Sequence, residues 1–569
     1  MIMLLCHRPS RAVLPIMAAC LSTLALLEAI PSRAAENTAV IASAETALLR
    51  GDCGIASSEY RQASQSQPRP ELAARATAVA LACGQNAAAK ADAERWLALA
   101  PHDADAQLAR IQAELVSYQL ADARTHFKAL LALPKMKAGD VIDELAQRAG
   151  TEPALAMIRG LDAPLLHEGD VQLALATLAL DGWDANLALR YAQAARAAGA
   201  HEASVAAIAS RARAVLGEAK AASEEARIAA GDKAGRLSLA QSLLVLGKEE
   251  DAQAELQRLR TDPDVGAVAA RLLAQLAIES GDYAVAEQRC NAMLSDPGSA
   301  PLAVYYLGLI AERRGDDEVA KRDFGLLAGT GFEAQGRRRV AGILFRQGDR
   351  DAAVRVLSAS RDAQPEERIR GELAAADLLS VSGAADEAVS RIDSALKRAP
   401  GNPEIAYQRA VLLERAGRAD AAISTLEALH RERPLDGSVT NALGFTLADH
   451  KRDLPRAEQL IREALLASPD NPAVLDSLGW VLYRRAQLEA ALPLLERAFR
   501  LLHDGDIGAH WGEALWTAGR RSAAEKAWQR ALAADPDSAL LTSTVHRYAP
   551  GLSAPKPLPA LEPAPRTSI

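Results

Sequence analysis

Histidine side chains offer the most direct route to chemistry in this chain, because two imidazoles on one helix face can bind a metal ion. His503 and His510 are seven residues apart, a spacing that would place them on the same face. Gly505 and Gly508 lie between them, so the sequence favours a loop histidine followed by a histidine at a helix start. The chain contains no HExxH, GxSxG, GxxxxGKS or GxxxxGKT motif. The sequence therefore predicts no catalytic residue, no metal site, no cofactor and no enzymatic activity.

Cysteine chemistry is confined to a few positions. Cys53 and Cys83 lie beside Gly51 and Gly84, which occupy matching positions in two successive units of a sequence repeat. In an oxidising compartment this pair could form a disulfide, provided that its Cα atoms come within about 7 Å. The alternative is two small buried thiols. The chain has no CxxC motif, so neither a zinc site nor a dithiol redox site is indicated.

That repeat, of about 34 residues, organises the chain, and it is clearest from Asp436 to Pro536. Leu443-Gly444, Leu478-Gly479 and Trp511-Gly512 mark the start of three successive units. Small residues and prolines recur at matching later positions: Ala457, Ala491 and Ala524, then Pro434, Pro469 and Pro536. Such a pattern predicts helical hairpins, with the small residues where the two helices cross. One hairpin cannot bury its own apolar face, so neighbouring hairpins must stack.

This pattern resembles the tetratricopeptide repeat, most closely in the last copy from Trp511 to Pro536. The resemblance implies an all-α fold, an α-solenoid of stacked hairpins wound into a right-handed superhelix. Composition agrees, because 49% of residues are hydrophobic but only 4% are aromatic, and sustained strand patterns are absent. Trp511, Trp528 and Phe499 match packing positions of the repeat and are expected in the core.

The repeat divides the chain into five predicted regions. Residues 1–34 form a signal peptide, and residues 35–134 form amino-terminal repeats marked by Pro68, Pro101 and Pro134. Residues 135–166 depart from the pattern and predict an irregular helical joint. The main array covers residues 167–536, and residues 537–569 contain a capping helix and a proline-rich disordered tail.

The amino terminus has the features of a secretory signal. A basic start precedes a mostly apolar stretch, and Ser32-Arg33-Ala34 offers small residues where a signal peptidase cleaves. A retained membrane helix is an alternative, although Pro15 and Glu28 disfavour it. Met17 to Cys20 resembles a lipobox, so lipidation at Cys20 is a third alternative. The membrane would then be reached only through a lipid or signal anchor.

Binding residues are expected on the surface of the repeats. In tetratricopeptide arrays the first helix of each hairpin lines the concave side. The resemblance places five aromatic residues there, outside the hairpin-packing positions: Tyr407, Phe445, Trp480, Tyr483 and Trp516. Clustered aromatic side chains suit a protein-binding site. The alternative is burial between adjacent first helices. A clamp for acidic tails is not supported, because only Asn441 falls at a suitable position.

The run from Asn441 to Trp528 is similar to the tetratricopeptide lipoproteins of Gram-negative outer membranes that serve as adaptors for a carboxyl-terminal processing protease. That resemblance implies a scaffold in the periplasm, associated with the outer membrane, that binds the protease and its cell-wall hydrolase substrates. Two alternatives stay open: a scaffold for envelope assembly or polysaccharide export, and a membrane-anchored interaction protein. Nucleic acid is not an expected partner, because the net charge is −8 and no basic stripe occurs.

Overall fold

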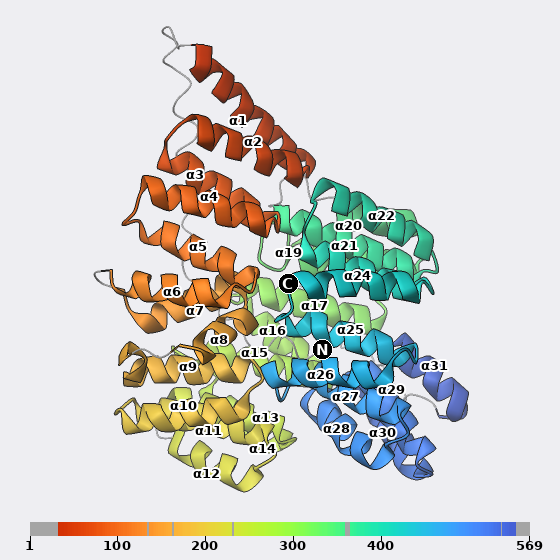
Figure 1. Cartoon of the computed structure of the whole chain (residues 1–569). Coiled ribbons are helices and arrows are strands. Elements are labelled where there is room, and N and C mark those ends of the chain that lie inside the picture. The colour runs from red at the N-terminus through yellow and green to blue at the C-terminus, as the bar shows by residue number, and fades with distance from the viewer. Residues whose placement is uncertain are drawn as a thin grey trace, which may run out of the picture.

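The computed structural model describes residues 32–133, 136–161, 164–229, 233–358, 365–535 and 538–552. Within these ranges the regular elements are helices and no strand occurs. Figure 1 shows the helices stacked as successive hairpins. The predicted all-α solenoid is therefore confirmed. Most of the predicted signal peptide, with Cys20, and the tail after Leu552 lie outside the described residues.

The first part of the chain forms a column of hairpins, coloured red to yellow in Figure 1. Its helices are α1 (Ser32–Arg50), α2 (Cys53–Ser66), α3 (Pro70–Ala82), α4 (Asn86–Leu99), α5 (Ala104–Val116), α6 (Leu120–Leu131), α7 (Ala138–Ala149), α8 (Thr151–Arg159), the short 3-10 helix η2 (Pro164–His167), α9 (Gly169–Asp181), α10 (Ala185–Ala197), α11 (Glu202–Val215) and α12 (Ala219–Ala229).

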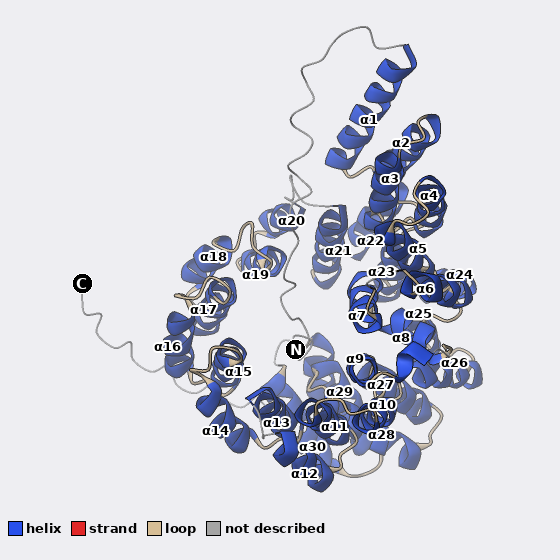
Figure 2. Ribbon diagram, turned by 90° about the vertical axis from the view of Figure 1, so that its left-hand side faces the viewer, coloured by secondary structure: helices blue, strands red, loops and turns tan. Residues whose placement is uncertain are grey.

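The middle of the chain forms an arc that turns the array round, as Figure 2 shows. Its helices are α13 (Lys233–Val245), α14 (Glu249–Leu259), α15 (Gly266–Glu279), α16 (Tyr283–Met293), α17 (Ala300–Arg314), α18 (Asp317–Gly325), α19 (Glu333–Arg346) and α20 (Arg350–Ser358).

The last part returns along the first column, so that the array closes on itself (Figures 1 and 2). Its helices are α21 (Pro365–Val381), α22 (Ala385–Arg398), α23 (Pro403–Arg415), α24 (Ala419–Glu432), α25 (Gly437–Asp449), α26 (Leu454–Ala467), α27 (Pro472–Arg484), α28 (Leu488–Leu501), α29 (Gly505–Thr517), α30 (Arg521–Ala534) and α31 (Ala539–Tyr548).

In many hairpins the turn between the two helices contains a glycine with a left-handed backbone. Gly247 has φ +70° and Gly417 has φ +72°, and Gly281, Gly315, Gly348 and Gly383 also have positive φ. In this region of φ an L side chain is strained, whereas glycine is not. The following N–H groups can then bond back to carbonyls at the end of the first helix. The period of these glycines therefore reports the period of the hairpins.

Contacts between the first and last parts of the chain form what we call the seam. Core residues of the first column and of α21–α30 share the same two apolar clusters. Polar contacts also cross it: Arg368 with the Leu49 carbonyl, Asn402 with the Cys83 carbonyl, Gly437 N–H with Glu152, and Asp470 N–H with the Trp183 carbonyl. The seam therefore ties residues about 300 positions apart into one body.

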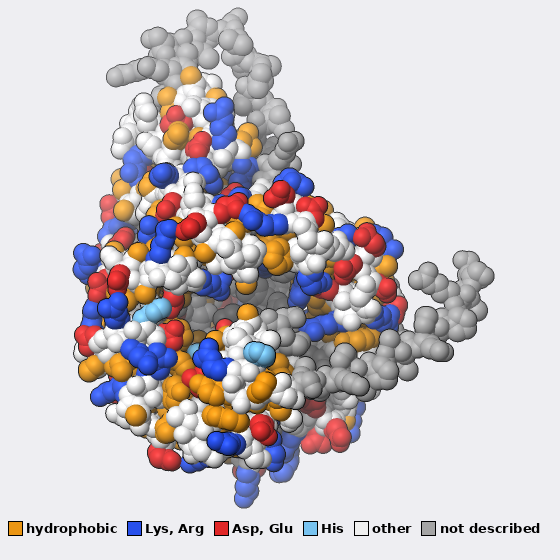
Figure 3. Space-filling view, turned by 90° about the vertical axis from the view of Figure 1, so that its right-hand side faces the viewer, with side chains coloured by type: hydrophobic (Ala, Val, Ile, Leu, Met, Phe, Trp, Pro, Cys, Tyr) orange, Lys and Arg blue, Asp and Glu red, His pale blue; other side chains and the backbone are white. Residues whose placement is uncertain are grey.

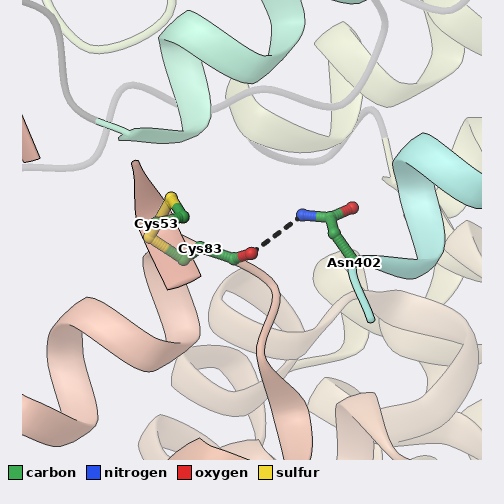
Figure 4. Close-up of a disulfide and its surroundings, with 3 residues drawn as sticks. All are labelled: Cys53, Cys83 and Asn402. Atoms are coloured by element: carbon green, nitrogen blue, oxygen red, sulfur yellow. Dashed lines mark hydrogen bonds between the residues drawn. A yellow bond between two sulfur atoms is a disulfide. The ribbon is translucent and has the colours of Figure 1, made fainter. Parts of the chain in front are cut away.

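A disulfide joins Cys53 at the start of α2 to Cys83 at the end of α3, with Cα atoms 5.6 Å apart. Figure 4 shows that the Cys83 carbonyl also points across the seam toward Asn402. The Asn402 Nδ2 group donates to this oxygen at 3.0 Å, while its Oδ1 accepts the N–H of Ile405 at 3.0 Å. The same buried side chain thus caps α23 and holds the disulfide-linked hairpins against it.

Candidate functional site

The first helices α25, α27 and α29 pack side by side in the last part of the array. Each begins after a polar residue whose side chain accepts backbone N–H groups of the first turn, as does α23. These N-cap residues recur once in every repeat and are Asn402, Asp436, Asn471 and Asp504. Caps of this kind fix where a helix begins. Side chains at equivalent positions therefore lie on one face of the stack.

Glycines inside these helices allow the second helix of each hairpin to approach. A Cβ atom at Gly479 would lie 2.6 Å from Leu495 Cγ, and one at Gly512 would lie 2.0 Å from Trp528 Nε1. Trp528 is wholly buried in the space that Gly512 leaves. The packing roles predicted for these glycines and for Trp528 are therefore confirmed.

The five aromatic residues expected on the concave surface have unequal exposure. Tyr407, Phe445, Tyr483 and Trp516 are half-buried, whereas Trp480 is only 4% exposed. Among the described residues, Tyr407 joins no ring contact and instead packs against the main apolar core. The other four belong to two separate ring groups. Trp480 therefore supports its neighbours and offers little surface of its own.

The first ring group, which we call the α27 cluster, consists of Phe445, Trp480, Tyr483 and His510. Trp480 and Tyr483 have ring centroids 4.9 Å apart. His510 stacks on Trp480, with centroids 4.1 Å apart and planes 24° apart, and it also lies 5.9 Å from Phe445. Phe445 on α25 and His510 on α29 thus meet across α27. Side chains of alternate hairpins therefore come into contact at this point of the stack.

The second ring group, which we call the α29 cluster, consists of Trp516, Trp528 and Tyr548. The ring centroid of Trp516 lies 5.7 Å from that of Trp528 and 6.1 Å from that of Tyr548. Tyr548 comes from α31, which packs against α29 and α30 at the end of the stack. Trp516 and Tyr548 keep part of their surface open while Trp528 anchors them from below.

His510 is the site residue that sequence reasoning misjudged. It was expected at a helix start after two breaking glycines, but it lies in the middle of α29, which begins at Gly505. Its Nδ1 lies 2.9 Å from Asp476 Oδ2, and both side chains are buried. Burial disfavours a charged imidazole, but the charge and hydrogen bond of Asp476, together with the charges of Asp506 and Asp449, outweigh it and raise the pKa of His510. The signal in the sequence was the spacing, because Asp476 and His510 lie 34 residues apart, which is about one repeat.

Carboxylates of these first helices accept hydrogen bonds from side chains of an adjacent hairpin. The Trp480 Nε1 group donates to Asp449 Oδ1 at 3.1 Å, and the Tyr483 hydroxyl donates to Glu513 Oε1 at 3.0 Å. Burial and the charge of Glu513 raise the pKa of Tyr483 to about 12, although its contact with Thr517 opposes the shift. These bonds link one repeat to the next along the surface.

One group of side chains has donor types that a metal ion could use. Ligand atoms of Glu414, Asp449 and His450 all lie within 4.8 Å of one another. The Arg484 guanidinium lies 3.6 Å from Asp449 Oδ1, and His450 Nε2 lies 3.3 Å from Glu414 Oε1. Burial raises the pKa of Glu414, and the nearby His450 opposes that shift. The arrangement is that of an ion-paired network between α23, α25 and α27.

Comparison with protein families gives matches to three separate parts of the array. Models described as tetratricopeptide repeat match residues 237–301, 271–328, 382–444 and 511–542. Together with the stacked hairpins, these matches decide the kind of repeat. The matched segments are tetratricopeptide repeats. Tetratricopeptide repeats are generally non-catalytic and bind other proteins, which indicates an interaction scaffold.

Individual relatives of this chain are more distant. A TPR repeat-containing protein of Pseudomonas aeruginosa is 30% identical over 211 residues, which are 37% of this chain and 36% of the relative. The match thus spans about a third of the relative. A thermophilic TPR protein of Thermus thermophilus is 22% identical over 32% of this chain and 96% of its own, with a TM-score of 0.29. Yeast Tom70 is 14% identical over 91% of this chain and 98% of its own, with a TM-score of 0.30.

The surface of the tetratricopeptide array carries charges of both signs. Figure 3 shows Lys and Arg side chains interspersed with Asp and Glu over the described part of the face it displays. Among the helices that the structure describes, none is both long and apolar enough to cross a membrane.

Proposed function

We propose that this protein is a non-enzymatic scaffold of the bacterial cell envelope that holds partner proteins on the concave side of its last hairpins. The two ring groups carry this proposal. Half-buried aromatic side chains that rest on a buried Trp are rigid and partly apolar, which is the character of interface hot spots. Tyr407, Phe445, Tyr483 and Trp516 provide the contact surface, and Trp480 supports it from beneath.

Two features support a location in the periplasm. The amino terminus has the basic, apolar and small-residue segments of a secretory signal. The Cys53–Cys83 disulfide also favours an oxidising compartment, because thiols stay reduced in the cytosol. Association with the outer membrane would follow from lipidation at Cys20, and a retained signal would instead anchor the chain in the inner membrane.

The more specific proposal is that the scaffold presents cell-wall hydrolases to a carboxyl-terminal processing protease. Its support is the similarity of residues 441–528 to the lipoprotein adaptors of such proteases. The test uses the purified full chain, the processing protease of the same organism and one of its hydrolase substrates. We expect the chain to bind the protease and to accelerate cleavage of the hydrolase.

Two outcomes would contradict the proposal, one for the adaptor role and one for the wider scaffold role. If cleavage is not accelerated and no complex forms, the adaptor role is wrong. A photo-reactive amino acid at Thr517, beside Tyr483, then tests the wider proposal in the envelope fraction, with the 79% exposed Leu466 as the control position. Adducts at Thr517 alone would leave a scaffold for envelope assembly or polysaccharide export. Equal or no labelling at the two positions would contradict the concave binding site.

Two tryptophan variants separate contact from packing. Trp516→Ala should weaken protease binding about thirtyfold, the effect of losing a hot spot of about 2 kcal/mol, with little change in the unfolding temperature. Trp528→Ala is the matched control, because removing a wholly buried Trp should cost about 3–5 kcal/mol of stability. Binding is measured by titration and stability by circular dichroism. If Trp516→Ala unfolds the last hairpins as Trp528→Ala does and leaves binding unchanged, the contact role is wrong.

A further inference from the structure

Glu513 on α29 is a carboxylate held between phenol groups. It is half-buried, and the Tyr483 hydroxyl donates to its Oε1 at 3.0 Å. Burial and then the charge of Glu513 raise the pKa of Tyr548, which places a second phenol near the same carboxylate. Among the described residues Glu513 forms no ion pair. A partly desolvated carboxylate of this kind is stabilised when a cation binds it.

In the neighbouring hairpins a similar carboxylate, Asp449, lies beside an aromatic ring and is paired with an arginine, Arg484. Asp449 accepts a hydrogen bond from Trp480, as Glu513 does from Tyr483. The guanidinium of Arg484 lies 5.3 Å from the Trp480 ring centroid and 3.6 Å from Asp449 Oδ1. A cation there contacts a carboxylate and an aromatic face together, which is a favourable combination. At Glu513 the carboxylate and the rings are present. Arg521 and Arg547 lie over the Trp516 and Tyr548 rings, but among the described residues neither forms an ion pair with Glu513.

The rings beside Glu513 have surface to offer a cation. Trp516 and Tyr548 are both half-buried, and Trp516 already attracts the guanidinium of Arg521, whose Cζ lies 5.2 Å from the ring centroid. Arg521 is exposed and forms no ion pair within the ranges that the structure describes. An exposed guanidinium held only by a ring is easily displaced by a partner that also reaches the carboxylate.

We propose that Glu513, Tyr483, Trp516 and Tyr548 form a seat for a lysine or arginine side chain of the bound partner. This inference rests on the proposed function and specifies its partner, since it assigns a basic residue to the segment that occupies the concave side. The carboxylate pairs with the ammonium or guanidinium group, and the aromatic faces cover its stem. An acidic partner tail is disfavoured, because the negative charge of Glu513 has no ion-pair partner among the described residues and would repel it.

The test is a phage-displayed library of random peptides selected on the purified full chain. The same selection uses Glu513→Gln, which keeps a hydrogen-bond acceptor but removes the charge, and Glu463→Gln, an exposed acid of the second helix α26, as control. We expect lysine or arginine to be enriched at one peptide position on the unmodified chain and on Glu463→Gln, and not on Glu513→Gln. Circular dichroism must show equal unfolding temperatures for the three proteins.

Affinity measurements on one selected peptide complete a double-mutant cycle. Replacing its basic residue with norleucine, or with citrulline if it is arginine, should weaken binding to the unmodified chain about tenfold and binding to Glu513→Gln by less than about twofold. Equal weakening in both, or enrichment without basic residues, overturns the seat while leaving the scaffold intact. If no peptide is enriched on any of the proteins, concave-side binding of an extended segment fails as well, and both proposals are wrong.

Discussion

Substitution of Gly84 is the sharpest test of the seam, because the methyl group of an alanine there would collide with Asn402 across the seam. Gly84 has φ +65°, and a Cβ atom on it would lie 2.3 Å from Asn402 Nδ2. Gly247 occupies the equivalent turn of another hairpin with φ +70°, but nothing lies within 4 Å of its Cβ position. Gly84→Ala and Gly247→Ala therefore share the backbone strain and differ only in the contact across the seam.

The expected difference in stability between the two variants comes from the hydrogen bonds that Asn402 loses. Left-handed backbone costs an alanine about 1–2 kcal/mol in either variant. In Gly84→Ala the Asn402 side chain must also move, which weakens the cap on Ile405 N–H, worth about 0.5–2 kcal/mol. It also leaves the buried Cys83 carbonyl without its donor, at about 1–3 kcal/mol. Gly84→Ala should therefore be about 2 kcal/mol more destabilising than Gly247→Ala.

Hydrogen exchange measured by mass spectrometry on the full chain is the suitable assay, because a repeat array opens locally as well as globally. Protection should fall in α3 and also in α23, on the far side of the seam. In an Asn402→Ala background the collision disappears, so Gly84→Ala should then cost no more than Gly247→Ala. Equal losses for the two glycine variants in the native background, or a loss confined to α3, would refute the reasoning.

Two further predictions concern the disulfide and the buried histidine. Replacing Cys53 and Cys83 by serine opens a loop with a sequence separation of 30 residues, and should destabilise α1–α4 by about 3.6 kcal/mol. If hydrogen exchange in α1–α4 is unchanged, the disulfide does not stabilise these helices. Because the folded pKa of His510 is raised above its unfolded value of about 6.5, its contribution is complete below that pH and is lost as pH rises through the folded pKa. The stability advantage over His510→Gln, from urea unfolding, should therefore be larger at pH 5.5 than at pH 8.5, and an advantage independent of pH would contradict the pairing with Asp476.

The helical hairpins could be predicted from the sequence because their determinants are local. Gly479 and Gly512 are glycines since a side chain of the same hairpin fills the space above them. Turn glycines such as Gly417 are needed for a backbone conformation within a few residues. Each requirement recurs once per repeat, so the period is visible without any knowledge of the tertiary structure.

The environment of His510 was not predicted because glycine has two roles that look alike in a sequence. Gly505 and Gly508 were interpreted as helix breakers, yet both lie within α29. A Cβ atom at Gly505 would lie 2.4 Å from Ser538 Cβ, and one at Gly508 would lie 2.3 Å from Ala531 Cβ. These glycines allow close packing instead of ending the helix. Only the separation of His510 from Asp476 by one repeat carried the correct information.

The seam could not be predicted because it depends on curvature, which accumulates from small rotations between repeats. Its register shows what the irregular segment at residues 135–166 contributes. Asn402 contacts Cys83, 319 residues earlier, whereas Asp470 contacts Ala185, 285 residues earlier. The second separation is shorter than the first by the length of one hairpin.

That hairpin is α7–α8, and its position at the seam accounts for the shorter sequence separation. The turn after α5 and the start of α8 converge on the beginning of α25: the Arg433 guanidinium lies 5.2 Å from the Tyr118 ring centroid, and Glu152 accepts the Gly437 N–H at 2.7 Å. Burial, and then the charge of Glu152, raise the pKa of Tyr118, so the two residues are neighbours. Two hairpins of the first column thus share one position opposite the last part. Where the repeat pattern is interrupted, two columns with unequal numbers of hairpins thus stay in contact at the start of α25.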